Sequence, residues 1–319
     1  MKETLNNDLI KAVKERLLED RNIVVVLMEA LSIGKEAVYR RLRGEVPFTF
    51  YEVVLIAKLM GLSLDEIAGN SVTNGALFSS NLQKTEDPFD YFYTICNSSR
   101  DIYTFIADDP KAMVSAAANA LPFVFHSHYE MLTKFRLCRW LHQYPDIKII
   151  KNMSNIHFPE KLMDLLFSLS DLLRQVPETC IIWDTNVFKA LANDIKYFID
   201  LNLMSEKDLS QIKTEFLDLL DEIEEAAYNG MYSNGNKLHV YISSINLESS
   251  YTYMEKTGFA LSIFHLYAID YIHSQHPDIC KEQKRWIDSL KRYSTLISSC
   301  AEKQRLTFFK EQREMVYAL

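Results

Sequence analysis

A short run of cationic side chains, residues 32–44, offers the clearest chemistry in this sequence. Its letters are SIGKEAVYRRLRG, and its charged residues are the acid Glu36 and the cations Lys35, Arg40, Arg41 and Arg43. The run therefore carries +3, whereas the whole chain of 319 residues carries −8. A cation cluster in an acidic chain favours an anionic partner, because guanidinium and ammonium groups pair with phosphates. The leading hypothesis for that partner is double-stranded DNA.

Helical spacing predicts which of these side chains face outward. Val38 and Leu42 are four residues apart and define a core face. In a helix that enters the major groove, residues near its start contact base edges and later cations contact phosphates. The candidate base contacts are Lys35, Glu36, Tyr39 and Arg40, and the candidate backbone contacts are Arg41 and Arg43.

Four further helices are predicted around the basic helix. Capping residues and apolar periodicity place helices at 5–20, 23–31, 35–43, 50–60 and 64–68. The Val24–Val26 run is β-branched and favours a strand by propensity alone, but its short length and helical flanks favour a helix. Gly44 ends the basic helix and Thr49 caps the next one. Two helices joined by the turn at 32–34 form a helix-turn-helix pattern.

Residues 22–68 resemble the lambda-repressor-like (Cro/XRE type) helix-turn-helix regulators. The resemblance rests on LSIGKEAVYRRLRGE, on the G-x-x-P of Gly44–Pro47, and on VVLIAKLMGLSLDEI, which is similar to the family's "l-x-x-i-A-x-x-L-g-v-s-l-d-x-l" ending. It implies a five-helix DNA-binding domain at 1–69. This chain departs from the family at the turn, where Ser32 and Gly34 stand as if exchanged. It also lacks the glutamines that the family often has at the starts of the second and third helices.

Composition indicates a two-domain protein with reduced thiols. The five cysteines are dispersed and include no CxxC pair, which suits a cytosol better than a disulfide framework. The charged N-terminus is unlike a signal peptide, and no apolar run approaches ~18 residues. We therefore expect a cytoplasmic protein without a membrane partner. Residues 1–70 contain 10 Lys and Arg against 11 Asp and Glu, which leaves 25 against 32 for the remainder.

A small polar stretch, residues 70–84, predicts a linker to a larger domain at 85–319. Few glycines and long periodic stretches favour a mostly helical domain. Asp87-Pro88 and Asp109-Pro110 are typical helix starts. Helices are expected at 88–107, 110–120, 122–143, 159–175, 184–201, 205–228, 278–299 and 301–317. Residues 146–151 suit a short strand or an extended linker, and the pattern at 238–268 predicts a small antiparallel meander.

Two stretches of the larger domain carry opposite charge. Residues 205–225 contain 2 basic and 8 acidic residues, whereas 281–314 contain 9 basic and 5 acidic ones. The basic stretch could add DNA contacts. Pairing with the acidic helix, within or between subunits, explains it at least as well.

Metal and catalytic sites are weakly indicated. His126 and His128, with His142 beyond, would point apart on a helix, and Pro277 interrupts the better-spaced set of Asp270, His273, His276 and Cys280. Ordinary surface or core roles are favoured for both groups. The chain has no P-loop, G-x-S-x-G, dinucleotide fingerprint or HExxH. We therefore expect no metal, no cofactor and no enzyme.

The sequence as a whole predicts a mainly α transcription regulator. The helix-turn-helix domain would bind DNA and the C-terminal domain would dimerise, because one small helix reads too few base pairs for specificity. A small-molecule or peptide effector is left open. One alternative is a peptide- or partner-binding protein with an aromatic groove drawn from Phe89–Tyr93 and Tyr251–Tyr253. The other is an enzyme with a DNA-binding domain, which clustering of Asp270, His273, His276 and Cys280 would favour.

Overall fold

The computed structural model describes residues 2–16, 23–60, 62, 64–67, 76, 78–81, 87–143 and 152–319. It divides into two compact units, Met1–Leu77 and Phe78–Leu319, here called unit 1 and unit 2. Most of the predicted linker, and all of 146–151, lie outside the described residues. Two residues of that predicted linker, Ser79 and Ser80, form strand β1 of unit 2.

The described part of unit 1 contains five helices around one apolar core. They are α1 (Lys2–Arg16), α2 (Ile23–Leu31), α3 (Lys35–Leu42), α4 (Phe50–Met60) and α5 (Leu64–Ile67). The β-branched run is helical, as predicted. Val24, Leu27 and Leu31 are buried at helical spacing on one side of α2, and they join Val38 and Ile56 in the core.

Unit 2 is built on an eight-stranded mixed sheet. Its strands are β1 (Ser79–Ser80), β2 (Met113–Ala118), β3 (Glu178–Trp183), β4 (Lys237–Ser243), β5 (Tyr251–Lys256), β6 (Phe259–Leu266), β7 (Asp270–Ser274) and β8 (Ser294–Leu296). Their order is β1-β7-β6-β5-β2-β3-β4-β8. The pairs β2–β3 and β3–β4 are parallel, and all other neighbours are antiparallel.

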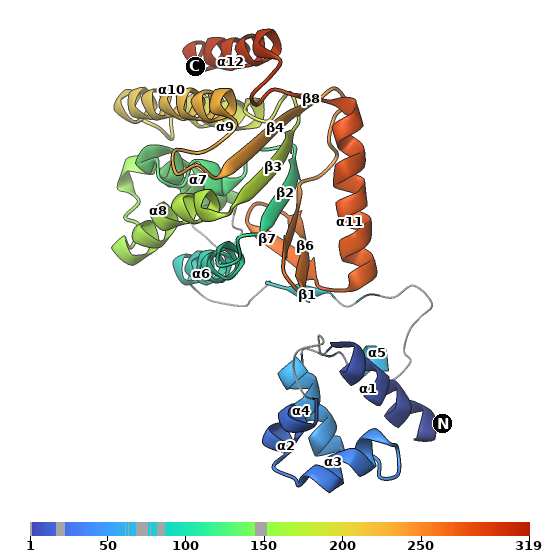
Figure 1. Ribbon diagram of the computed structural model, residues 1–319. Helices are drawn as coiled ribbons and strands as arrows, with labels where there is room; N and C mark the ends of the chain where they lie inside the picture. Colours follow the sequence, from blue (N-terminus) through green and yellow to red (C-terminus); the bar gives the residue numbers. More distant parts are fainter. Residues whose placement is uncertain are drawn as a thin grey trace. The chain divides into compact units, whose positions relative to one another are not determined.

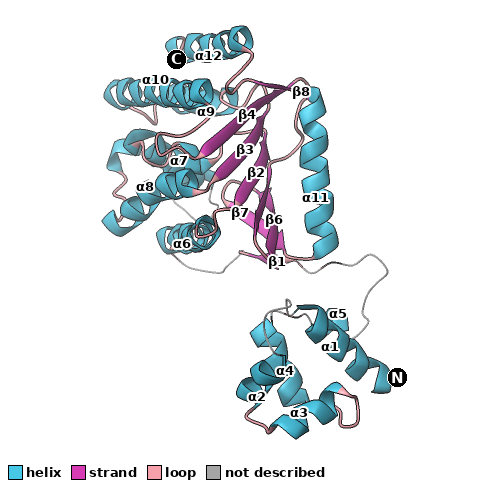
Figure 2. Ribbon diagram, viewed as in Figure 1, coloured by secondary structure: helices cyan, strands magenta, loops and turns pink. Residues whose placement is uncertain are grey.

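Helices cover both faces of this sheet. They are α6 (Pro88–Ala107), α7 (Glu130–Gln143), α8 (Glu160–Gln175), α9 (Lys189–Asp200), α10 (Glu206–Asn229), α11 (Pro277–Leu290) and α12 (Glu302–Tyr317). Short 3-10 turns lie at Phe123–Phe125, Met153–Asn155 and Lys291–Tyr293. In Figure 1, α6 to α10 lie on one side of the sheet and α11 on the other. Figure 2 shows the sheet in magenta between these two helical layers.

The mainly α prediction with a small meander is therefore wrong. The chain predicted as a helix at 110–120 contains β2, which pairs in parallel with β3 and antiparallel with β5. The strands predicted within 238–268 belong to the large sheet: β4 pairs in parallel with β3, while β5, β6 and β7 run antiparallel. Helical crossovers join β2 to β3 and β3 to β4, as parallel pairing requires.

Several predicted helices are shorter than expected, whereas others keep their bounds. α7 starts at Glu130 after a 3-10 turn, α9 starts at Lys189, and α11 ends at Leu290 before β8. The helices predicted at 88–107, 159–175, 205–228 and 301–317 are confirmed as α6, α8, α10 and α12. Ser205 and Asp208 form a capping box at the start of α10. None of the described helices is long and apolar enough to cross a membrane.

The basic stretch at the end of the chain packs on the acidic helix of the same unit. Arg313 of α12 donates to Asp221 at 2.9 Å and also pairs with Glu224 on α10. The Lys213 ammonium donates to the Tyr317 carbonyl at 3.2 Å. The pairing expected between these stretches is thus formed within one chain. The guanidinium of Arg313 therefore already has two carboxylate partners on α10.

Candidate functional site

The outer face of α3 carries most of the predicted DNA-contacting side chains. Lys35, Glu36, Tyr39 and Arg40 are exposed on the helix, and Arg43 is exposed at its C-terminal cap. Val38 is completely buried on the opposite face. The Lys35 ammonium lies 5.9 Å from the centre of the Tyr39 ring. The local sequence pattern thus turns the polar residues of this short helix outward.

Two acidic residues, Glu36 and Glu45, form ion pairs with the cations of that face. Glu45 pairs with Arg43 at 2.6 Å and with Arg40 at 3.4 Å, and Arg43 also reaches Glu36 at 3.2 Å. The hydrogen bond from Arg43, followed by its charge, holds the pKa of Glu45 below the ordinary value. All four groups are exposed, so these ion pairs open at little cost. A polyanion could therefore replace the carboxylates as the partner of Arg40 and Arg43.

Arg41 occupies a different environment from the other cations. Its guanidinium pairs with Glu52 of α4 at 2.8 Å, and both side chains are mostly buried. Glu52 also accepts from the Thr49 amide at 2.7 Å, while the Thr49 hydroxyl accepts from the Glu52 amide at 3.3 Å. This capping box begins α4. Arg41 therefore fixes α3 against the start of α4.

The turn before α3 contains the two residues that depart from the family pattern, Ser32 and Gly34. Ser32 has φ +52°, in the left-handed region that glycine adopts most readily. Gly34 is the N-cap, with φ −71° and ψ 158°, values open to any residue, and it provides no side-chain cap. The structure thus places a serine where glycine is favoured and a glycine where serine would cap.

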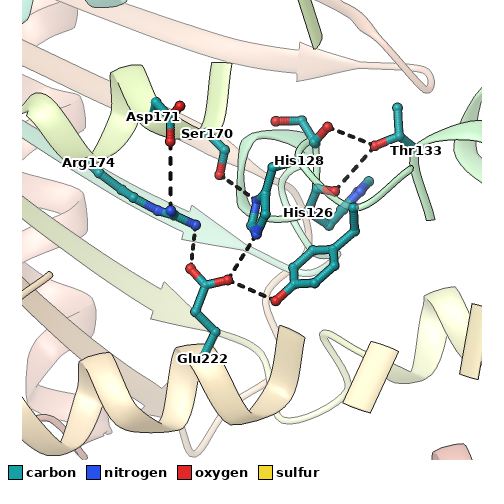
Figure 3. Close-up of polar contacts among 9 residues, drawn as sticks. His126, His128, Thr133, Ser170, Asp171, Arg174 and Glu222 are labelled. Carbon is teal, nitrogen blue, oxygen red and sulfur yellow. Dashed lines mark hydrogen bonds and ion pairs between the residues drawn. The ribbon is translucent and has the colours of Figure 1, made fainter. Parts of the chain in front are cut away.

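A polar network in unit 2 contains a serine, a histidine and a glutamate in contact (Figure 3). Ser170 Oγ lies 3.0 Å from Nδ1 of His128, and Nε2 of His128 lies 3.0 Å from Glu222 Oε2. Tyr129 donates to the same carboxylate oxygen at 2.9 Å, and Arg174 pairs with its other oxygen. Burial opposes the charge of Glu222, but the bond from His128 and the charge of Arg174 outweigh it and lower its pKa.

This network joins elements and leaves no room for a substrate. Ser170 is 2% exposed, and the cavity beside it has a volume of about 10 Å³, enough for one water molecule. The contacts connect α8 and α10 to the loop before α7. We therefore assign the network a structural role, although its residue types resemble those of a hydrolase triad.

The residues considered as metal ligands occupy separate places in unit 2 and have other contacts or are buried. His126 is completely buried, and burial, followed by the charge of Arg136, lowers its pKa well below the ordinary value. Asp270 accepts a hydrogen bond from the Tyr91 hydroxyl, and Cys280 is buried in α11. Within the described ranges, no group of three or more His, Cys, Asp or Glu side chains could hold a metal ion.

A larger cavity of about 480 Å³ lies in unit 2, where β2 ends. Its lining comes from helices α6 to α9, from the end of β2 and the turn after it, and from β5, β6, β7 and the loops beside these strands. Of the aromatic stretches singled out in the sequence, Phe92 lines this cavity, whereas Tyr251 and Tyr253 pack in the cluster that contains α11 residues. Crevices beyond the carboxyl ends of parallel strands are the usual ligand sites of open α/β sheets.

Sequence reasoning missed the charged residues of this cavity. Arg136, Arg139 and Asp194 line it from α7 and α9, and His265 lines it from β6. Single charges on predicted helices are indistinguishable from a solvated face. The one available signal was the run of small residues Ala116–Ala118 and Ala120, which leaves space beside the sheet.

Comparisons of the chain with protein-family models, with curated proteins and with solved structures find no match. The resemblance of residues 22–68 to helix-turn-helix regulators therefore rests on the motif residues themselves. We take the exposed face of α3 and the cavity beside β2 as the two candidate binding sites.

Proposed function

We propose that this protein is a sequence-specific DNA-binding transcriptional regulator that acts as a dimer. The observation that carries the proposal is the exposed cationic face of α3, which follows a short turn from α2. Lys35, Glu36, Tyr39 and Arg40 project from the first two turns of that helix. Such positions reach base edges when a recognition helix enters the major groove.

Each side chain has a distinct proposed role. Arg40 would bind guanine O6 and N7 in a bidentate manner, and Glu36 would accept from a cytosine amino group. Arg43 would exchange Glu45 for a backbone phosphate. The sequence pattern also assigned Arg41 to the phosphates, but its pairing with Glu52 supports positioning α3 as its main role.

Dimerisation by unit 2 supplies the remaining specificity in this proposal. One α3 helix contacts few base pairs, whereas two helices related by a two-fold axis read two half-sites about one helical turn apart. Binding would block or assist transcription at a promoter, and an effector held by unit 2 would shift subunit geometry. Cytoplasmic location belongs to the same proposal.

The experiment is selection of bound DNA from a random pool by the full chain and two variants. Arg40→Ala removes the proposed base contact, while Lys58→Ala removes an exposed cation from α4 and serves as the matched control. We expect an enriched palindromic site for wild type and Lys58→Ala, and its loss or alteration for Arg40→Ala. An absence of enrichment, or the same site for all three proteins, would refute the proposal.

The alternative of an enzyme would be favoured if the four predicted residues clustered at one concave site, and the cavity gives no support for such a cluster. Asp270, His273, His276 and Cys280 do not line the cavity beside β2. A binding module without a catalytic role is the second candidate, and the observation that favours it is the cavity itself. A small-molecule site fits that cavity better than a peptide groove, because it lies between the sheet and its covering helices.

A further inference from the structure

The cavity beside β2 has a sheet floor and a helical cover. Strand register places Ala116 opposite Thr252, and Thr252 opposite Ile263, so these side chains lie on one face. Phe92 of α6 and Trp140 of α7 contribute aromatic walls from the covering layer. Ala116, Ala118 and Ala120 keep space open where longer side chains would fill it.

Arg136 is the charged side chain of this cavity on which the inference rests, because its guanidinium has no hydrogen bond or ion pair among the described residues. Arg139 pairs with Asp194 at 2.6 Å. Arg136 lines the cavity about one turn before Arg139, is only partly exposed, and makes no hydrogen bond or ion pair with any described residue. Burial, followed by the neighbouring charge of Arg139, lowers the pKa of Arg136 to about 10, so it stays charged at neutral pH.

The other titratable groups compensate that charge only in part, because the attraction of Asp194 is the smallest of the effects on the pKa of Arg136 and no carboxylate bonds to its guanidinium among the described residues. Burial lowers the pKa of His265 to about 4, so its ring is neutral, and it lies 3.1 Å from the Thr252 hydroxyl. Glu248 contributes to the rim and is exposed to solvent. Among the described residues of the lining, only the Asp194 carboxylate forms an ion pair, and that pair is with Arg139. Holding an unpaired charge in an apolar setting is costly, and an anion bound beside it removes that cost.

We propose that this cavity binds a small amphipathic organic anion, with its acidic group on Arg136 and its apolar or aromatic body between Phe92, Trp140 and the alanine-lined end of β2. A volume of about 480 Å³ is in the range of drug-sized ligands. A carboxylate, sulfonate or phosphate monoester shares the required chemistry. Any control of DNA binding by this ligand rests on the proposed function, whereas the binding itself does not.

A matched pair of fluorescent probes tests the charge requirement on the full chain. Anilinonaphthalene sulfonate is an amphipathic anion, and N-phenylnaphthylamine has the same aromatic body without the sulfonate. Arg136→Gln removes the proposed counter-charge. Arg285→Gln removes an exposed charge from α11, on the opposite side of the sheet, and serves as the control. Circular dichroism verifies that each variant keeps its fold.

We expect saturable binding of both probes to the wild-type protein with one site per chain. Arg136→Gln should weaken sulfonate binding roughly tenfold or more, because a charge-assisted hydrogen bond is lost. Binding of the neutral probe should change less than about twofold, and Arg285→Gln should alter neither affinity. A second variant, Ala118→Leu, fills the cavity and should weaken both probes.

Three outcomes would overturn the proposal. They are sulfonate binding that Arg136→Gln does not weaken, equal weakening of both probes by that variant, and the absence of a saturable site. These measurements contain no DNA, so their failure leaves the proposed DNA-binding function standing. Failure of the DNA selection would likewise leave the anion site standing.

Discussion

At the residue scale, the turn before α3 holds two residues in each other's preferred conformation. Ser32 adopts φ +52°, and Gly34 caps α3 without a side chain. We predict that exchanging them, Ser32→Gly with Gly34→Ser, stabilises the protein. The glycine relieves left-handed strain and the serine hydroxyl caps the first turn, which together contribute about 1 kcal/mol.

Chemical denaturation of the full chain, followed by helical circular dichroism, measures this effect. The single variant Ser32→Gly measures the relief of backbone strain, and the single variant Gly34→Ser measures the effect of the cap. A double variant no more stable than wild type would show that Ser32 gains from a contact which offsets its backbone strain.

Glu45 is the residue whose removal should strengthen DNA binding. Its carboxylate pairs with both Arg40 and Arg43 and would lie near the phosphates that these cations approach. We predict that Glu45→Gln raises affinity for the selected DNA several-fold at low salt. The gain should shrink as salt screens the charges.

Fluorescence anisotropy across a salt series checks this prediction. Asp8→Asn removes one exposed acid from α1 and is the control. An unchanged or lower affinity for Glu45→Gln would indicate that Arg40 and Arg43 do not approach phosphates.

At the scale of elements, the junction of α3 and α4 depends on an ionised Glu52. Burial opposes its charge, but bonds from Thr49 and Arg41 prevail and lower its pKa below 4.5. A depressed carboxylate pKa stabilises the folded state above the unfolded pKa, and this contribution is lost as pH falls through the folded pKa. We predict that Glu52→Gln costs roughly 1–3 kcal/mol at neutral pH and progressively less below about pH 4.5.

Denaturation of wild type and Glu52→Gln over that pH range gives the difference directly. Subtraction cancels the other carboxylates, because they titrate in both proteins. A constant difference across the range would exclude ionisation of Glu52 as the cause of its stabilising effect.

Elements with their own end signals were predictable from sequence. Asp87-Pro88 starts α6 and the Ser205–Asp208 box starts α10, where the structure has them. β2 was not predictable, because MVSAAA is composed mostly of good helix formers and is extended only between β3 and β5. β3 is buried along most of its length, so it lacks the alternation that marks a half-exposed strand.

The two candidate sites also differ in whether they could be predicted from the sequence. α3 concentrates its cations within a few residues, so composition alone drew attention to it. The cavity assembles Phe92, Arg136, Thr252 and His265 from four separate elements. No local spacing relates these residues, because the sheet order that brings β5 and β6 beside β2 is itself non-local.

At the scale of the whole molecule, charge is distributed unevenly along the chain. Residues 71–319 contain 25 basic and 32 acidic residues, so unit 2 should repel DNA. Non-specific affinity therefore depends on unit 1, whose α3 cations face three nearby carboxylates. A single copy of such a unit binds weakly, and two linked copies multiply their contributions.

That reasoning predicts that the full chain requires two half-sites. Scrambling one half of the selected palindrome should lower affinity about a hundredfold or more, because each mismatched base pair costs roughly 1–3 kcal/mol and one α3 helix loses all its base contacts. Sedimentation of the free protein should show a dimer at the concentrations used. Anisotropy titrations of intact and half-scrambled duplexes measure the ratio, with equal affinities as the result that would exclude dimeric recognition. A dimer that binds both duplexes equally would place its second α3 away from the DNA, and unit 2 would then hold the subunits together for a purpose other than reading a palindrome.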